Sequence, residues 1–192
     1  QSAVIICHRG RKLSEGAAAI LRCNGIRAEV LEGGSEGWRA AALPAIPLST
    51  LPQTALWVTR HRPKIDRIAC PWLIRRFIDP QAQFCWLENV ADCPADALGF
   101  DFDGATFTHI GNRVTFETLM ASFGLEQDVG LQRLGKLVHT LDVGGTNPEA
   151  AGFALLLKGL KHRLSDDDTL LREGGRILDD FYNAYALQEH VS

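Results

Sequence analysis

A proline-rich stretch limits what this chain can fold into. Pro44, Pro47 and Pro52 stand within nine residues of a 192-residue chain. Proline fixes its own backbone, removes an amide donor and disfavours helix in the residue before it, so this stretch favours an extended linker. It predicts a first block at residues 1–47, a linker at 48–54 and a second block at 55–192.

The first block is predicted to form a parallel βαβα unit. An apolar run at residues 3–6 and a second one at 26–31 are typical of buried strands, and the Ala/Leu-rich residues 13–23 between them favour a helix. Asn24 and Gly25 should end that helix, and a short helix should follow through Trp38 to Ala42. Because two strands and two short helices bury little apolar surface, we expect this block to belong to a larger domain or to pair with strands from elsewhere.

The second block is predicted to be a mixed, mainly α-helical α+β domain. Apolar residues recur on one face of residues 64–78, where Pro71 should kink the helix or mark a restart. Thr115 should cap a helix over 115–123, and Asp166, Asp167 and Asp168 should cap the last helix. Strands are expected at 56–59, 83–87 and 106–110, and further helices at about 128–141, 148–163 and 168–187.

Composition excludes several classes of protein. The formal net charge of −3 gives no overall field that would attract nucleic acid, and no apolar run approaches the roughly 20 residues of a membrane span. The five cysteines contain no C-x-x-C spacing, which argues against a disulfide framework or a zinc knuckle. We therefore expect reduced thiols, a cytoplasmic location, and no membrane or nucleic-acid partner; the oligomeric state stays open.

Cys7 opens a cationic loop directly after the first predicted strand. The loop continues with His8, Arg9, Gly10, Arg11 and Lys12, and a helix starts behind it. Loop amides, the positive end of a helix and nearby cations all favour a thiolate and can hold an anion. The sequence thus predicts a nucleophilic cysteine with an anion-binding loop, although a buried, inert thiol at a strand end is the simpler alternative. A cysteine phosphatase loop fits less well, because its arginine would fall at Leu13.

A second motif accompanies this loop. Gly33, Gly34 and Trp38 follow the next strand in the pattern Gly-Gly-x-x-x-Trp, and with residues 7–12 they resemble the C-terminal half of a rhodanese domain over residues 3–47. The resemblance implies that Cys7 takes sulfur from an anionic donor such as thiosulfate, holds it as a persulfide and passes it to a thiol acceptor. It implies no cofactor for sulfur transfer. The strands that precede the catalytic strand in that family are not found in this sequence.

Basic residues gather at the start of the predicted helix at 64–78. Arg60 and the group Arg62, Lys64 and Arg67 surround this helix start, which makes it a candidate oxyanion site. A solvated basic rim is the alternative.

The same segment carries the second resemblance. Residues 62–77 (RPKIDRIACPWLIRRF), Phe107-Thr-His109, Thr115-Phe116-Glu117 and His139-Thr-Leu-Asp142 resemble the C-terminal domain of the ChrB-type chromate-resistance family over about 55–190. The resemblance implies a role in chromate tolerance, by sensing or by direct handling of the oxyanion.

His109, His139, Asp142 and Cys70 are candidate ligands of a divalent metal, with Glu117 as a further candidate and Asp66 nearby in sequence. His139 and Asp142 are three residues apart on one predicted helix. A His–Asp hydrogen bond between two elements would explain the same residues. Three functions stay open: a sulfurtransferase centred on Cys7, a chromate-binding sensor or regulator, and a metal-dependent enzyme using His109, His139 and Asp142.

Overall fold

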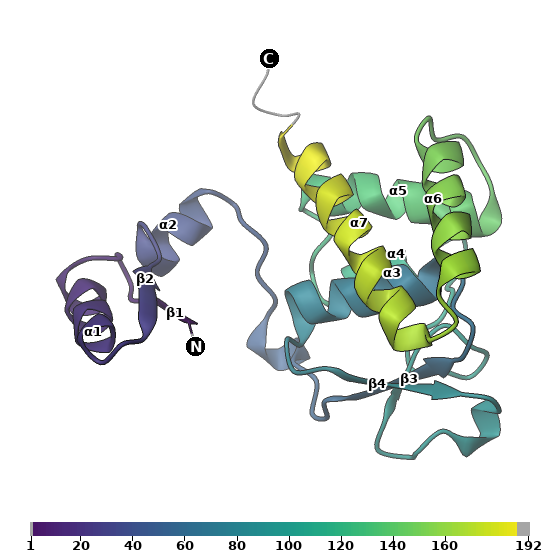
Figure 1. Ribbon diagram of the computed structural model, residues 1–192, viewed down its shortest axis with the longest axis horizontal. Helices are drawn as coiled ribbons and strands as arrows, with labels where there is room; N and C mark the ends of the chain where they lie inside the picture. The colour runs from purple at the N-terminus through teal and green to yellow at the C-terminus, as the bar shows by residue number, and fades with distance from the viewer. Residues whose placement is uncertain (1, 188–192) are drawn as a thin grey trace. The chain divides into compact units, whose positions relative to one another are not determined.

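The computed structural model describes residues 2–187 (Figure 1). The chain divides into two compact units, Gln1–Pro44 and Ala45–Ser192, and each is described by itself. The end of the predicted second block, residues 188–192, lies outside the described residues. Within the described part, no helix is both long and apolar enough to cross a membrane.

The first unit has the predicted order of elements. β1 (Ser2–Ile5), α1 (Lys12–Cys23), β2 (Arg27–Val30) and α2 (Gly34–Ala40) follow one another, and β1 pairs in parallel with β2. The predicted helix end is also confirmed, since α1 stops before Asn24 and Gly25 has a φ of +76°. Apolar side chains of this unit, including Val4, Ile6, Leu13 and Ile20, are exposed. The unit therefore buries little apolar surface by itself, as the shortness of its elements predicts.

A three-stranded parallel sheet begins the second unit. Its order is β4 (Gln83–Leu87), β3 (Leu56–Arg60), β5 (Leu98–Gly99), so β3 is central and its Trp57 and Val58 are fully buried. A 3₁₀ turn, η1 (Leu48–Thr50), precedes β3 in the proline-rich stretch, and a second, η3 (Val90–Asp92), lies between β4 and β5.

The predicted strand at 106–110 is wrong. This segment forms two isolated bridges and no strand: Phe107 pairs with Phe100, and Ile110 pairs with Arg113 across the turn at Gly111. The Phe107 ring stacks on Trp57 with ring centroids 5.7 Å apart. The alternating pattern of 106–110 thus reflects one side chain packed into the core, and not a ladder of hydrogen bonds.

The helix predicted over 64–78 consists of two segments. α3 (Asp66–Leu73) includes Pro71, and all eight of its residues are buried. The chain then forms a π-helical turn, η2 (Ile74–Ile78). Near Pro71, where the sequence predicts a kink or a restart, the structure thus has a change of helix type three residues later.

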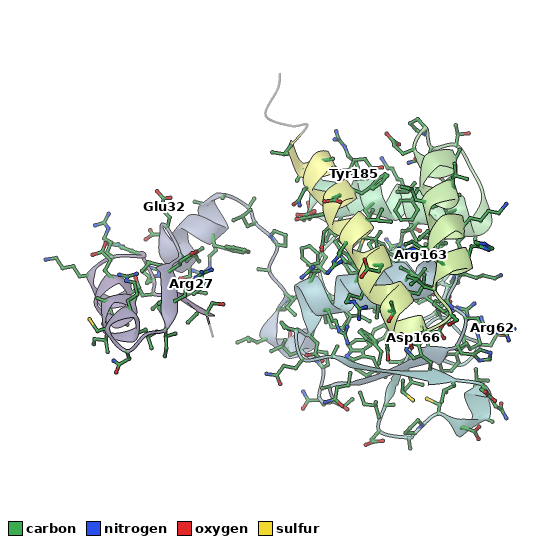
Figure 2. The ribbon with its side chains drawn as sticks, viewed as in Figure 1. Arg27, Glu32, Arg62, Arg163, Asp166 and Tyr185 are labelled. Carbon is green, nitrogen blue, oxygen red and sulfur yellow. The ribbon has the colours of Figure 1, made fainter. Side chains whose placement is uncertain are left out.

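Four helices complete the second unit and lie on one side of the sheet (Figure 1): α4 (Thr115–Ser122), α5 (Val129–Val143), α6 (Ala150–Arg163) and α7 (Asp167–Leu187). α7 packs against α3 and α5. Asp166 caps α7 as predicted, since its carboxylate accepts the Thr169 amide at 2.7 Å, and Tyr185 is buried near the other end of this helix (Figure 2). The mixed, mainly helical architecture expected from the sequence is confirmed.

Candidate functional site

Asp66 connects two helices at the centre of the second unit. It is the first residue of α3, yet its carboxylate accepts the amides of Thr115 (2.8 Å) and Phe116 (3.1 Å), which begin α4. The predicted capping role of Thr115 is therefore corrected: a carboxylate from another helix binds the free amides, where it also complements the helix dipole. Burial, followed by the negative charge of Asp101, raises the pKa of Asp66 to about 6.

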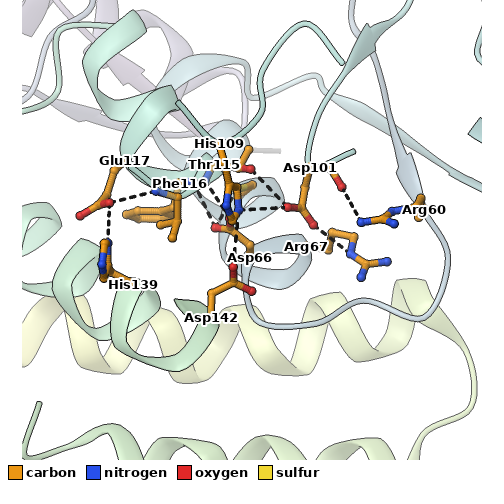
Figure 3. A network of polar contacts seen from close by, with 12 residues as sticks. Arg60, Asp66, Arg67, Asp101, His109, Thr115, Phe116, Glu117, His139 and Asp142 are labelled. Atoms are coloured by element: carbon orange, nitrogen blue, oxygen red, sulfur yellow. Dashed lines mark hydrogen bonds and ion pairs between the residues drawn. The ribbon is translucent and has the colours of Figure 1, made fainter. Parts of the chain in front are cut away.

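His109 lies among three carboxylates (Figure 3). Its Nε2 atom is 3.2 Å from Asp66 Oδ2, 3.4 Å from Asp142 Oδ2 and 3.7 Å from Asp101 Oδ1. Ligand atoms of Asp66, His109 and Asp142 all lie within 4.8 Å of one another. One imidazole and two carboxylates form a suitable partial ligand set for zinc or manganese.

Cationic side chains form another wall of the same site. Arg67 Nε is 2.9 Å from Asp101 Oδ2, and its NH1 donates to the His61 carbonyl at 3.0 Å. Arg60 NH2 donates to the Asp101 carbonyl at 3.3 Å. Arg60, Lys64 and Arg67 line a cavity of about 410 Å³ together with His109 and Asp142. The cavity thus places anion-binding and cation-binding groups next to each other.

The sheet explains why these residues meet. Arg60 is the last residue of β3, and Asp101 follows the neighbouring strand β5. Carboxyl ends of parallel strands share one edge, where binding sites of such sheets commonly form. Sequence reasoning did not identify Asp101, because the strand that positions it, Leu98–Gly99, has only two residues and is too short to recognise from sequence.

Two of the four predicted metal ligands, His109 and Asp142, are brought together with Asp66. His139 is placed elsewhere, because its Nδ1 is 2.9 Å from Glu117 Oε2, which also accepts the Val114 amide (Figure 3). Residues three apart on an α-helix point about 60° away from each other, so His139 and Asp142 reach different partners. The expected pairing of His139 with His109 and Asp142 is thereby corrected.

Cys70 is also outside the ligand group. Its Sγ donates to Asp66 Oδ1 at 3.5 Å, and burial, followed by the charge of Asp66, raises the pKa of the Cys70 thiol well above its usual range. Since a thiolate is the form that binds metal, this protonated thiol is a hydrogen-bond donor to Asp66.

The predicted basic cluster is divided by the fold. Lys64 and Arg67 line the cavity, whereas Arg62 is not among its lining residues. The backbone of Arg62 has a φ of +54°, and its amide donates to Asp167 Oδ2 at 2.9 Å. Arg62 therefore joins the α7 start to the loop after β3.

In the first unit, Cys7 lies in a hydrogen-bonded loop. Its Sγ is 3.2 Å from Ser14 Oγ. This hydrogen bond, followed by that of the Arg11 amide, lowers the pKa of Cys7 to about 7. Arg9 is directed to Glu36, with 3.0 Å between Nε and Oε2, and His8 is 3.8 Å from the same oxygen. Hydrogen bonds thus account for the lowered thiol pKa.

The two motifs of the first unit are in direct contact. The Ser35 amide donates to the Cys7 carbonyl at 3.0 Å, and the Glu36 amide to the His8 carbonyl at 2.9 Å. A side chain at Gly34 would place its Cβ 2.1 Å from the Cys7 carbonyl oxygen, and one at Gly10 would lie 2.3 Å from the Leu31 oxygen. These glycines are required for the close approach of the loop, residues 7–12, to the turn after β2.

The similarity to a known protein family lies in the second unit. The family model of the ChrB C-terminal domain matches residues 57–185. Protein ChrB of Cupriavidus metallidurans is 61% identical over 131 residues, which make up 68% of this chain and 40% of that protein, so the chain matches less than half of the relative's length. No solved structure is significantly similar. Because the family model covers most of the chain, the protein belongs to the ChrB C-terminal-domain family of chromate-resistance proteins.

Proposed function

We propose that the second unit acts in chromate resistance by binding a chromate-like oxyanion in the cavity at His109, together with a divalent cation. The cation would be held by Asp66, His109 and Asp142. The supporting observation is that these ligand atoms lie within 4.8 Å of one another, and that two of the three residues, His109 and Asp142, line a cavity that is also lined by Arg60, Lys64 and Arg67.

The charges of the cavity explain why a cation is needed. Three cationic side chains line it, and these face the carboxylates of Asp101, Asp103 and Asp142, with Asp66 behind them. The carboxylates thus outnumber the cationic side chains by one, which disfavours a dianion. A divalent cation reverses the sign, and chromate and sulfate then both become suitable ligands.

Each side chain has a defined part in this proposal. The amides of Thr115 and Phe116 fix the Asp66 carboxylate before a cation binds. His109 contributes Nε2 as a neutral imidazole, while Asp101 and the His61 carbonyl hold the Arg67 guanidinium at the cavity wall. Such prior ordering reduces the entropy lost when the ligands bind.

Metal analysis combined with calorimetry tests the proposal. Purified chain loaded with Mn²⁺ or Zn²⁺ should retain one metal ion, and chromate or sulfate should bind more tightly to it than to chain treated with a chelator. Asp142→Asn should lose both effects. Asp96→Asn, which changes an exposed carboxylate away from the cavity, is the matched control. Chromate affinity that is unchanged by metal removal would contradict the proposal, and metal-dependent consumption of chromate would favour the enzyme alternative over a binding domain.

A second candidate function concerns the first unit. We infer that Cys7 acts as a rhodanese-like sulfur carrier, because its pKa of about 7 makes a thiolate available at neutral pH and its loop packs on the Gly33–Gly34 turn. The Cys7 thiolate would attack the sulfane sulfur of thiosulfate, the S–S bond of the donor would break, and sulfite would leave. A thiol acceptor would then take the outer sulfur and regenerate the thiolate. All five cysteines are free, which suits a reducing cytoplasm.

Mass spectrometry after incubation with thiosulfate tests this candidate. The intact chain should gain one sulfur atom, and Cys7→Ser should abolish the gain. Cys23→Ser, at an exposed cysteine of the same unit, should leave it intact. Sulfur found on the Cys7→Ser chain would eliminate the assignment.

A further inference from the structure

A second, larger cavity lies on another part of the second unit. It measures about 580 Å³ and is bordered by η2, β4 and α7, and it shares no lining residue with the cavity at His109. Its volume falls within the range typical of small-molecule sites.

Four arginines line this cavity from two elements. Arg75 and Arg76 belong to η2, and Arg172 and Arg176 lie four residues apart on one face of α7. π-Helical turns are rare and often occur at functional sites. Here the π-helical turn presents two consecutive guanidinium groups.

The carboxylates at the cavity are already hydrogen-bonded. Asp179 accepts the Trp72 indole N–H at 2.7 Å and pairs with Arg76, and Asp168 accepts the Trp86 indole N–H at 2.9 Å.

Arg172 and Arg176 both pair with Glu173, but their side chains are 60% and 69% exposed. Ion pairs at such exposure are weak, so a multivalent anion can replace Glu173. The cavity therefore has a surplus of positive charge.

An aromatic wall accompanies this charge. The Arg75 guanidinium lies over the Phe84 ring at 4.6 Å and donates to the Ala82 carbonyl from both Nε and NH2 at 3.3 Å. The guanidinium is thereby fixed as a planar cation, a surface on which a nucleobase can stack. Pro71, Trp72 and Leu171 add apolar surface.

Close packing does not require a glycine at position 175 of α7. A Cβ at Gly174 would lie 2.8 Å from Ile68 Cγ2, so packing against α3 excludes a side chain there. A Cβ at Gly175 would lie 3.6 Å from Trp72 Cδ1, an ordinary contact, although glycine is unfavourable in a helix. Gly175 lines the cavity, and a larger side chain at this position would occupy it.

We propose that this cavity binds a nucleoside di- or triphosphate, with its phosphates between the arginines of η2 and α7 and its base against Arg75 and Phe84. The ligand class follows from the combination of several guanidinium groups with a planar, partly apolar wall. An inorganic polyanion would use only the charges, and an uncharged nucleoside only the wall.

Displacement of fluorescent N-methylanthraniloyl-ATP from the full chain tests the proposal. ATP should displace it, whereas inorganic triphosphate and adenosine should each compete at least roughly tenfold less well. Triphosphate that competes as well as ATP would overturn the nucleotide assignment. So would a short DNA duplex that competes better than ATP, and so would a lack of binding by the fluorescent nucleotide.

Two independent sets of variants locate the site. The double variant Arg172→Gln/Arg176→Gln should weaken binding roughly tenfold or more, while Arg163→Gln, at the exposed end of α6 (Figure 2), should not. Gly175→Leu should weaken binding by filling the cavity, and Gly175→Ala should retain it within about threefold, since the added methyl has room. Binding that both the double variant and Gly175→Leu leave unchanged would place the nucleotide elsewhere and overturn the proposal.

Discussion

Two adjacent glycines of α7 should respond in opposite directions to the same substitution. In the interior of a helix, Gly→Ala stabilises by about 1 kcal/mol, because alanine has the higher helix propensity. Gly175→Ala should show this gain, since its Cβ would meet Trp72 Cδ1 at 3.6 Å. Gly174→Ala adds a methyl 2.8 Å from Cγ2 of Ile68, a fully buried, β-branched side chain with little freedom to move.

The magnitude follows from these two contacts. Overpacking of a closely packed core costs about 1–3 kcal/mol, so Gly174→Ala should change the free energy of unfolding by between about zero and a loss of 2 kcal/mol. Because the propensity gain is common to both variants, the difference between them should equal the overpacking cost of about 1–3 kcal/mol.

Urea unfolding of the second unit, followed by tryptophan fluorescence, measures this difference. Trp57, Trp72 and Trp86 report on this unit, and comparable slopes with denaturant would show that only stability has changed. If Gly174→Ala unfolds at the same or a higher urea concentration than Gly175→Ala, the close contact between α7 and α3 is refuted.

Three further predictions concern the candidate sites. Alkylation of Cys7 by iodoacetamide should accelerate with a midpoint at about pH 7, because the thiolate is the form that reacts. Ser14→Ala should move this midpoint to higher pH, since it removes the hydrogen bond to Cys7 Sγ. An unchanged midpoint would show that Ser14 does not stabilise the thiolate. His109→Ala should abolish metal retention, whereas His139→Ala should leave it intact, as elemental analysis would reveal; equal losses would place His139 in the ligand set. In metal-free chain, the raised pKa of Asp66 means that the folded state binds its proton more tightly than the unfolded state. The contribution of Asp66 to the free energy of unfolding should therefore fall by about 2 kcal/mol between pH 4 and pH 6 and level off above about pH 7, and Asp66→Asn should flatten this slope in urea titrations.

Local patterns predicted most of the secondary structure. The apolar face of residues 128–141 corresponds to Val129–Val143, and Asn24-Gly25 marks the end of α1. These signals succeed because helix periodicity and termination depend on residues within one or two turns. The prediction for 106–110 failed for the opposite reason: its alternation is compatible with a strand, but its backbone forms only two isolated bridges, with Phe100 and Arg113, and no continuous ladder.

The candidate metal site was predicted in part. His109 and Asp142 were identified from residue type and from family resemblance, and the structure places their side-chain atoms 3.4 Å apart. The choice between His139 and Asp66 as the third residue could not be made from spacing. It depends on the contact between Asp66 in α3 and the first amides of α4, two helices that are far apart in the sequence.

The sequence by itself determined the order of most elements, the Cys7 loop and the chromate-resistance family, because each depends on neighbouring residues or on a continuous motif. Tertiary structure decided which side chains share a cavity. Asp66, Asp101, His109 and Asp142 come from four segments, and Arg60 joins them because β3 and β5 end at the same edge of a parallel sheet. Burial also raises the pKa of Asp66 and of Cys70, and this desolvation arises only in the packed chain.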